Sequence, residues 1–247
     1  MRDEAKQLMD NPIWSALATD HAALATGGDE ARRYPEDIGP LSGMPAESEA
    51  NWAALAALAG QGGAQGAFGG GGVLALFFRE TPQIPAGWTV VRGGTLAQMV
   101  AERPRLVEAA KPEGVTLRIL TAEDAPAMVE LAELTEPGPF RIRTLELGTF
   151  FGIVDQGWLL AMAGKRMHMP GFVEVSGVCT HPDARGRGYA RLLMSCVMEE
   201  IVADGKTPFL HVLASNAGAI RVYEDLGFRV RRELEFAAVA RTSARSG

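Results

Sequence analysis

The stretch HPDARGRGYARLLM at His181–Met194 places alternating arginines and glycines directly before apolar residues of helical spacing. A strand-like run, FVEVSGVCT, precedes it, so the stretch is expected to join a strand to a helix N-terminus. Free backbone N–H groups gather at such a terminus, where the helix dipole favours an anion. Gly186 and Gly188 would let a phosphate approach the main chain, and Arg185 and Arg187 add positive charge. A plain turn flanked by solvated arginines is the alternative interpretation.

The patterns on either side of this stretch alternate between strand and helix from Val115 onward. Alternating or continuous apolar runs predict strands, and apolar residues three and four positions apart predict helices. In chain order the expected elements are strand 115–120, helix 125–134, a hairpin within 150–167, strand 172–180, helix 189–201, strand 208–214 and helix 216–226, followed by a last strand. This order predicts an α/β domain with a mixed sheet.

Local turn chemistry supports several of these boundaries. Thr121 and Asp124 have the spacing of a capping box ahead of the first helix. Ser215 or Asn216 can cap the last helix, and Gly227 is expected to end it.

Residues 1–112 are expected to form an N-terminal α/β lobe and residues 113–247 a second domain, because KPEG at Lys111–Gly114 is typical of a turn. The N-terminal part contains a glycine tract at Gly60–Gly72. The tract leads from a helix-like segment into a strand-like one, whereas a phosphate-binding loop leads from a strand into a helix. It is therefore interpreted as a connection. LAQMVAERP at Leu96–Pro104 is expected to form a short helix.

The composition restricts the function classes. The chain has 24 Lys and Arg residues against 30 Asp and Glu residues, a net charge of -6, so no broad cationic surface for nucleic acid is expected. Apolar runs are far shorter than the ~20 residues of a membrane span, and the first residues lack the apolar core of a signal peptide. A cytoplasmic location without membrane contact is expected. The histidines and cysteines show no zinc-like spacing, so no metal site is expected.

Two motifs give the sequence a resemblance to a known family. RGRGYA at Arg185–Ala190 matches the Q/R-x-x-G-x-G/A motif of the GCN5-related N-acetyltransferases (GNAT), and NAGAIRVYEDLGF at Asn216–Phe228 resembles their second signature. The residues around the first motif are similar to the FR47-like branch. The resemblance covers residues 115–236 and implies an α/β (α+β) GNAT fold, with a mixed, mostly antiparallel central sheet flanked by helices. Residues 1–112 are compatible with a degenerate half of the same fold.

The resemblance implies a site for the co-substrate acetyl-CoA. The pyrophosphate would lie on the turn before the helix, and the pantetheine arm would pair with the preceding strand, where a bulge expected at Gly177 opens a wedge. The Val178 N–H would donate a hydrogen bond to the thioester carbonyl. The expected binding residues are Val178, Cys179, Thr180, Arg185, Gly186, Arg187, Gly188, Tyr189, Ala190, Arg191 and Asn216.

Two side chains complete the implied mechanism. Glu174 matches the position of the general base in the histone acetyltransferase branch, and an extended strand would project it to the same face as Val178. The alternative is a half-buried carboxylate paired with Lys165 or Arg166. Tyr223 matches the family's usual general acid near the CoA sulfur, and its alternative is a tyrosine of the core.

Cys179 is a further candidate, as an acylated nucleophile with His181 or His211 as its base. Its side chain would face away from Val178, so a buried structural cysteine is the simpler interpretation.

These residues imply acetyl-CoA-dependent N-acyl transfer to a primary amine of a small molecule, an amino acid or a peptide, by direct attack of the amine. Two alternatives stay open: a sensor that binds acyl-CoA without turnover, and an enzyme that uses a longer acyl group. The oligomeric state is also open, a homodimer included.

Overall fold

The computed structural model describes residues 7–59, 72–107 and 114–242. Most of the glycine tract and of the turn expected to separate two domains lies outside these residues. The helices are α2 (Pro12–Ala18), α3 (Glu49–Leu58), α4 (Ala125–Thr135), α5 (Tyr189–Ala203) and α6 (Ala217–Asp225). The strands are β1 (Thr26–Gly27), β2 (Arg32–Arg33), β3 (Ser42–Gly43), β4 (Leu74–Phe78), β5 (Trp88–Val100), β6 (Thr116–Ile119), β7 (Phe150–Asp155), β8 (Trp158–Met169), β9 (Phe172–Thr180), β10 (Thr207–Leu213) and β11 (Arg229–Arg241).

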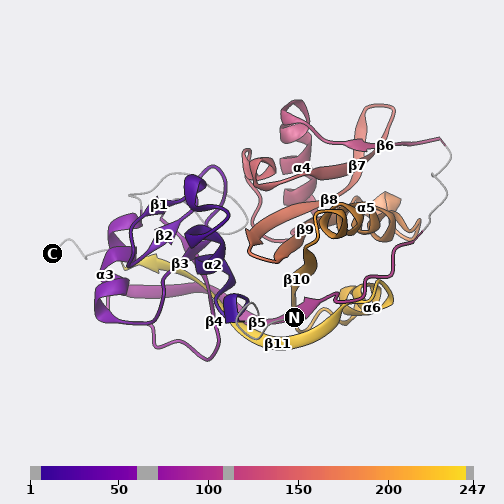
Figure 1. Ribbon diagram of the computed structural model, residues 1–247. Helices are drawn as coiled ribbons and strands as arrows, with labels where there is room; N and C mark the ends of the chain where they lie inside the picture. The colour runs from indigo at the N-terminus through magenta and orange to yellow at the C-terminus, as the bar shows by residue number, and fades with distance from the viewer. Residues whose placement is uncertain (1–6, 60–71, 108–113, 243–247) are drawn as a thin grey trace.

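The centre of the molecule is an 8-stranded sheet with the order β4-β11-β5-β10-β9-β8-β7-β6 (Figure 1). All neighbouring strands run antiparallel except β9 and β10, which are parallel. The short strands β1, β2 and β3 form a separate 3-stranded sheet. The prediction of a mixed, mostly antiparallel sheet flanked by helices is confirmed.

The order of elements predicted from Val115 onward is also confirmed. The capping box forms, because the Thr121 backbone N–H donates to the Asp124 carboxylate over 2.8 Å and Asp124 donates its own N–H back. At α6 the side-chain oxygen of Asn216 accepts from the Ala219 N–H over 3.1 Å. Gly227 follows α6 with a φ of 94°, a conformation that favours glycine.

The helix expected at Leu96–Pro104 is wrong, because Leu96–Val100 completes β5. This segment pairs with β10 on one side and with β11 on the other. Burial between two neighbours overrides the helical preference of residues such as Leu, Ala, Gln and Met. Residues on both sides of the expected domain boundary therefore share one sheet.

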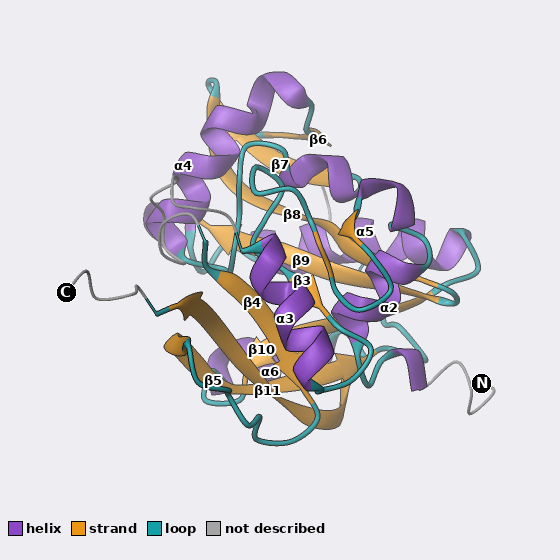
Figure 2. Cartoon of the chain, turned by 90° about the vertical axis from the view of Figure 1, so that its left-hand side faces the viewer, coloured by secondary structure: helices purple, strands orange, loops and turns teal. Residues whose placement is uncertain are grey.

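The sheet has two differently covered faces. On one, the α5 face, α5 and α6 pack over the strands; on the other, the N-terminal face, lies α2, with α4 against β8 and β9 (Figure 1). α3 instead packs against Leu74 and Leu76 of β4, whose side chains alternate with that of Ala75 on the N-terminal face. Figure 2 views the molecule from the side on which α3 lies. The core of the α5 face includes Leu193, Val197 and Ile201, and that of the N-terminal face includes Ile13 and Phe172.

Two imidazoles help to pack the N-terminal segment against β8. The ring centroids of His21 and His168 are 4.9 Å apart, and the His21 Nδ1 lies 2.8 Å from the buried Tyr34 hydroxyl. Burial, together with the neighbouring His168, lowers the pKa of His21 to about 4. Burial likewise lowers the pKa of His168 to about 4, with the nearby Lys206 and Lys165 acting in the same direction. Both rings are therefore neutral in the folded protein at neutral pH.

The unfolding free energy is expected to fall as the pH drops from 6.5, the ordinary pKa of histidine, toward about 4. In this window the two imidazoles bind protons in the unfolded chain but not in the folded chain. Each imidazole therefore contributes up to ~1.4 kcal/mol per pH unit to the slope of the unfolding free energy against pH. His168→Leu should reduce the slope. Urea denaturation at about pH 7 and about pH 5 measures it, and an undiminished slope in the variant would contradict this assignment.

Candidate active site

The strands β9 and β10 separate after a short paired stretch. Their ladder ends at Phe209 and Glu174, so no strand of the described structure pairs with the later part of β9 on that side. Gly177 has a φ of 61°, and the pairing with β8 shifts register beside it, between Met162 and Gly164. A Cβ at Gly177 would also lie 2.9 Å from the Phe150 ring. The bulge and the wedge expected at this glycine are confirmed.

The bulge changes which side chains share a face. Val178 packs in the core of the α5 face together with Val173 and Val175. Glu174 alternates with those two valines and therefore points to the N-terminal face. The expectation that Glu174 and Val178 project to one face is wrong, because the extra residue at Gly177 interrupts the two-residue alternation.

A cavity of about 280 Å³ passes through the sheet at this wedge. Its walls combine residues from the cores of both faces, together with Thr135 at the end of α4 and the loop 136–139 that follows it. From the α5 face come Val178, Val212, Ala219 and Tyr223, and from the N-terminal face come Leu41, Phe77, Leu96 and Phe236. Arg166, His211 and Asn216 also line it. The cavity thus gathers Val178, Asn216 and Tyr223 of the expected site, whereas Glu174 lies behind its wall.

The turn before α5 has the backbone that an anion site needs. Gly186 and Gly188 both have a φ of 77°, and a Cβ on either would meet no atom within 4 Å. Gly188 is the N-cap of α5 and offers no capping side chain. Within the described residues, none of the backbone N–H groups from Gly186 to Arg191 has an acceptor outside the helix. These groups fit the pyrophosphate of a nucleotide.

The side chains around this turn differ in what they can offer. Arg185 makes no hydrogen bond or ion pair with a described residue, and Arg187 donates only to the Asp183 carbonyl over 3.4 Å. Arg191 pairs with Asp225 of α6 over 2.6 Å. The Tyr189 side chain is buried in the core of the α5 face, so only its main chain can meet a ligand. Ala190, at the second position of α5, is likewise limited to its main chain.

The Cys179 thiol is buried in a cluster formed with α4 and β8, which includes Met128 and Met162. Burial raises its pKa to about 12. A thiol held protonated in such surroundings is a poor nucleophile, which supports the structural interpretation. Cys179 and Thr180 can therefore contribute to a wedge site through the main chain of β9.

Glu174 is completely buried and fully partnered. Its carboxylate accepts from Nε and Nη2 of Arg166 over 2.6 and 2.7 Å and lies 2.8 Å from Nδ1 of His211. Burial alone would raise the pKa of Glu174, but the Arg166 charge and the hydrogen bonds lower it to about 2. Of the two partners expected from the sequence, Arg166 is the one found. Lys165 instead pairs with Glu200 of α5 over 2.8 Å.

The hydrogen bonds around His211 define its tautomer. The Gln98 amide nitrogen lies 2.8 Å from the Met9 carbonyl and 3.0 Å from Nε2 of His211, while the Gln98 oxygen accepts from Arg231 over 2.8 Å. Because the amide nitrogen only donates, Nε2 is the acceptor and Nδ1–H donates to Glu174. Sequence reasoning missed Gln98, whose signal is one polar residue within an apolar run.

This polar network crosses consecutive strands of the sheet. Arg231 of β11, Gln98 of β5, His211 of β10, Glu174 of β9 and Arg166 of β8 form one hydrogen-bonded series. Every strand between β11 and β8 supplies a member, so the network fixes the relative positions of the strands on both sides of the wedge.

Tyr223 reaches the cavity from α6. Its ring contacts Phe228 at a centroid distance of 6.3 Å, and its hydroxyl makes no hydrogen bond with a described residue. Burial raises the pKa of Tyr223 to about 12, so the hydroxyl stays protonated at neutral pH. Among the described residues the side chain is thus a protonated donor without a protein acceptor, and its proton is available to a ligand in the cavity.

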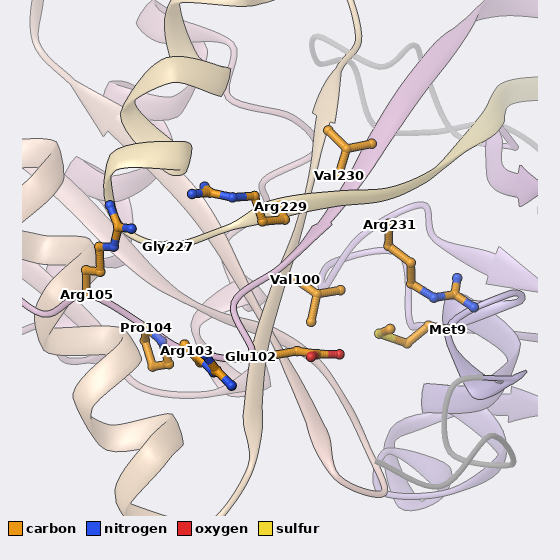
Figure 3. Close-up of a pocket in the computed structure, with 10 residues that line it drawn as sticks. All are labelled: Met9, Val100, Glu102, Arg103, Pro104, Arg105, Gly227, Arg229, Val230 and Arg231. Atoms are coloured by element: carbon orange, nitrogen blue, oxygen red, sulfur yellow. The ribbon is translucent and has the colours of Figure 1, made fainter.

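A larger hollow of about 740 Å³ lies at the C-terminal end of β5, around Val100 and Gly227 (Figure 3). It holds none of the expected site residues. Figure 3 shows that its arginines come from both β11 and the segment after β5, and that Arg229 and Arg231 extend in different directions. Arg229 donates to the Glu224 and Phe228 carbonyls at the end of α6, over 3.0 and 2.7 Å, which is a capping role.

Comparisons with known proteins agree with this geometry. The family model of FR47-like proteins matches residues 150–237. A ribosomal protein bS18-alanine N-acetyltransferase of Salmonella typhimurium is 31% identical over 123 residues, which are 46% of this chain and 80% of that protein.

Solved structures extend the similarity over nearly the whole chain. A protein of Novosphingobium aromaticivorans, described as an acetyltransferase of the GNAT family, is 36% identical with a TM-score of 0.80, covering 95% of this chain and 99% of that one. A GCN5-related N-acetyltransferase from Kribbella flavida shares the fold at 16% identity, with a TM-score of 0.56 and coverage of 94% and 97%.

The chain therefore belongs to the GNAT family and is an N-acetyltransferase. Enzymes of this family use acetyl-CoA as co-substrate, and the turn and wedge described above suit its pyrophosphate and its extended arm. Among the described residues, no helix is long and apolar enough to cross a membrane. The same residues contain no group of three or more side chains suited to bind a metal ion.

Proposed function

We propose that this enzyme transfers the acetyl group of acetyl-CoA to a primary amine of a small molecule, an amino acid or a peptide, by direct attack of the amine. The observation that carries the proposal is the cavity through the sheet, because it joins a wall bearing Tyr223 to a wall bearing His211. Two reactants can enter from opposite faces and meet at the wedge, which replaces a bimolecular encounter by a fixed geometry. We place this activity in the cytoplasm, as the composition suggests.

The co-substrate would be held mainly by main-chain groups. The N–H groups of residues 186–191 would bind the pyrophosphate, with Arg185 and Arg187 adding charge. The unpaired part of β9, from Val178 to Thr180, would pair with the extended arm, and Asn216 and Tyr223 would border it. When bound, acetyl-CoA supplies the activated acyl group, and the Val178 N–H would stabilise negative charge on its carbonyl oxygen.

Tyr223 would protonate the departing thiolate. Its hydroxyl is protonated at neutral pH and has no acceptor among the described residues, which leaves its proton available to the sulfur. Its raised pKa makes the donation less favourable than that of an ordinary phenol, so contact with the developing negative charge must compensate.

Removal of the amine's proton is assigned to His211, held by Glu174. With a pKa of about 2 and all its oxygens partnered behind the wall, Glu174 is a weak base at neutral pH. His211 lies on the wall, and its Nε2 is the acceptor in its hydrogen bond with Gln98. The amine would take the place of Gln98 at Nε2, and the resulting imidazolium would be stabilised by Glu174 through Nδ1–H. Glu174 is then a positioning residue.

One observation favours a second candidate function. Because both oxygens of Glu174 and both nitrogens of His211 are already partnered, the site also suits a sensor that binds acyl-CoA without turnover. Release of free thiol in the presence of an acceptor amine separates the enzyme from the sensor.

Gly188→Glu should lower the affinity for CoA by at least about 10-fold, or about 1.4 kcal/mol, because it puts a side chain and a negative charge on the proposed phosphate site. Calorimetry with CoA measures the affinity. Gly205→Glu is a matched control, since Gly205 has a φ of 70° with no atom within 4 Å of a Cβ and follows the other end of α5. Equal affinities of the two variants would remove the turn from the site.

Tyr223→Phe should lower kcat by roughly 10²- to 10⁴-fold while the dissociation constant of acetyl-CoA stays nearly unchanged, because only the proton donor is lost. The ring contact with Phe228 is kept, so thermal unfolding should barely shift. Steady-state rates, calorimetry and thermal unfolding on one preparation provide the three values. Full kcat in a folded Tyr223→Phe enzyme would end the assignment of Tyr223 as acid.

His211→Gln should lower kcat by roughly 10²- to 10⁴-fold, because glutamine can still donate to Glu174 but cannot take up the amine's proton. The pH dependence of kcat/KM should lose the ionisation that belongs to the base. Glu174→Gln is the comparison, with its stability measured first because Arg166 loses its partner. If Glu174 is itself the base, His211→Gln will keep kcat within a few fold while Glu174→Gln abolishes it.

A further inference from the structure

The half of the cavity on the N-terminal face is apolar and aromatic. Phe77 packs edge-on against His211 at a centroid distance of 4.9 Å and against Phe236 at 6.1 Å. Leu41 and Leu96 belong to the same core and also line the cavity. Apart from His211 itself and Arg166, which is paired with Glu174, the wall around the proposed proton acceptor is thus built from hydrocarbon side chains. Three of these, Leu41, Phe77 and Leu96, come from the N-terminal part of the chain.

The charged residues that line the cavity are balanced within the described structure. Arg166 is neutralised by the buried Glu174, and Arg92 lies 4.0 Å from Glu136 at the exposed rim. Among the described residues of this wall, Glu136 is the one carboxylate, and it already faces Arg92. A second ammonium group on the acceptor would therefore enter a hydrocarbon wall without a counter-charge, which is costly.

The size of the cavity points in the same direction. Its volume of about 280 Å³ includes the part beside Val178 and Tyr223 that the acetyl end would fill. What is left on the N-terminal face suits a compact group rather than a long chain. An amine on a small apolar body would bury its hydrocarbon against Phe77 and Phe236 and present its nitrogen to His211.

We propose that the acceptor is a primary amine carried on a compact apolar or aromatic body, and that Phe77 determines this specificity. The inference rests on the proposed N-acetyltransferase reaction and adds the chemical class of its acceptor. Phe77 contributes through contact area and ring geometry, since it lies between His211 and Phe236 and reaches the cavity from the edge strand β4.

The test compares 2-phenylethylamine, hexylamine and spermidine as acceptors, following thiol release from acetyl-CoA. We expect kcat/KM for 2-phenylethylamine to exceed that for spermidine by about 10-fold or more. Phe77→Ala should raise the KM for 2-phenylethylamine by about 10-fold or more with little change in the affinity for acetyl-CoA. Phe77→Leu, which keeps an apolar side chain, should give an intermediate value. Ile119→Ala, on the exposed edge strand β6, is the control and should match the parent enzyme.

A readout without turnover supports the kinetics: calorimetric titration of 2-phenylethylamine into the enzyme saturated with CoA, where Phe77→Ala should weaken binding by a similar factor. A higher kcat/KM for spermidine would overturn the acceptor class and leave the acetyltransferase reaction standing. Binding of acetyl-CoA without thiol release on any of the three amines would overturn the proposed reaction, and the acceptor class with it. Unchanged KM and binding in folded Phe77→Ala would overturn the role of Phe77.

Discussion

The separation of β9 from β10 is the constraint on which the rest of the site depends. A fully paired parallel ladder would close the wedge, saturate the main chain of β9 and divide the two faces of the sheet. The bulge at Gly177 prevents this, and it requires glycine for two independent reasons: the positive φ and the Phe150 ring close to where a Cβ would lie. One backbone irregularity therefore leaves main-chain groups of β9 free to pair with a ligand, and it opens a cavity between the cores on the two faces of the sheet.

The network from Arg231 to Arg166 explains how a sheet with an opening at its centre stays defined. Buried ion pairs contribute little net stability, because desolvation offsets the attraction, yet removal of one partner is destabilising by about 3–5 kcal/mol. The main effect of the Glu174–Arg166 pair is therefore to fix the relative positions of β9 and β8, rather than to add stability. Through His211 and Gln98 it ties strands from the beginning and the end of the chain to the wedge.

Much of the fold could be predicted from the sequence, because its signals are local. The capping box at Thr121, the cap at Asn216 and the glycine turn before α5 depend on neighbouring residues alone. The errors arose where distant residues decide. Leu96–Val100 has the composition of a helix, but its strand partners lie more than a hundred residues away in β10 and β11. Whether Glu174 and Val178 face the same side depended on whether Gly177 adds a residue to the strand. The hydrogen bond between His211 and Gln98 could not be predicted, because Gln98 lies in the segment expected to be a helix.

The position of β5 has a consequence for how this protein can be folded and divided. The region matched by the family model, residues 150–237, contains β10 and most of β11 but not the strand that joins them. Expressed alone, it would leave both strands with open hydrogen-bonding edges, which invite pairing between molecules. In the whole chain β5 is separated from its neighbours β10 and β11 by more than a hundred residues. Formation of the central sheet therefore relies on contacts of high sequence separation and is expected to be slow. Residues 150–237 are thus not expected to fold on their own, and an evolutionary exchange of one half of this chain would have to carry β5 with it.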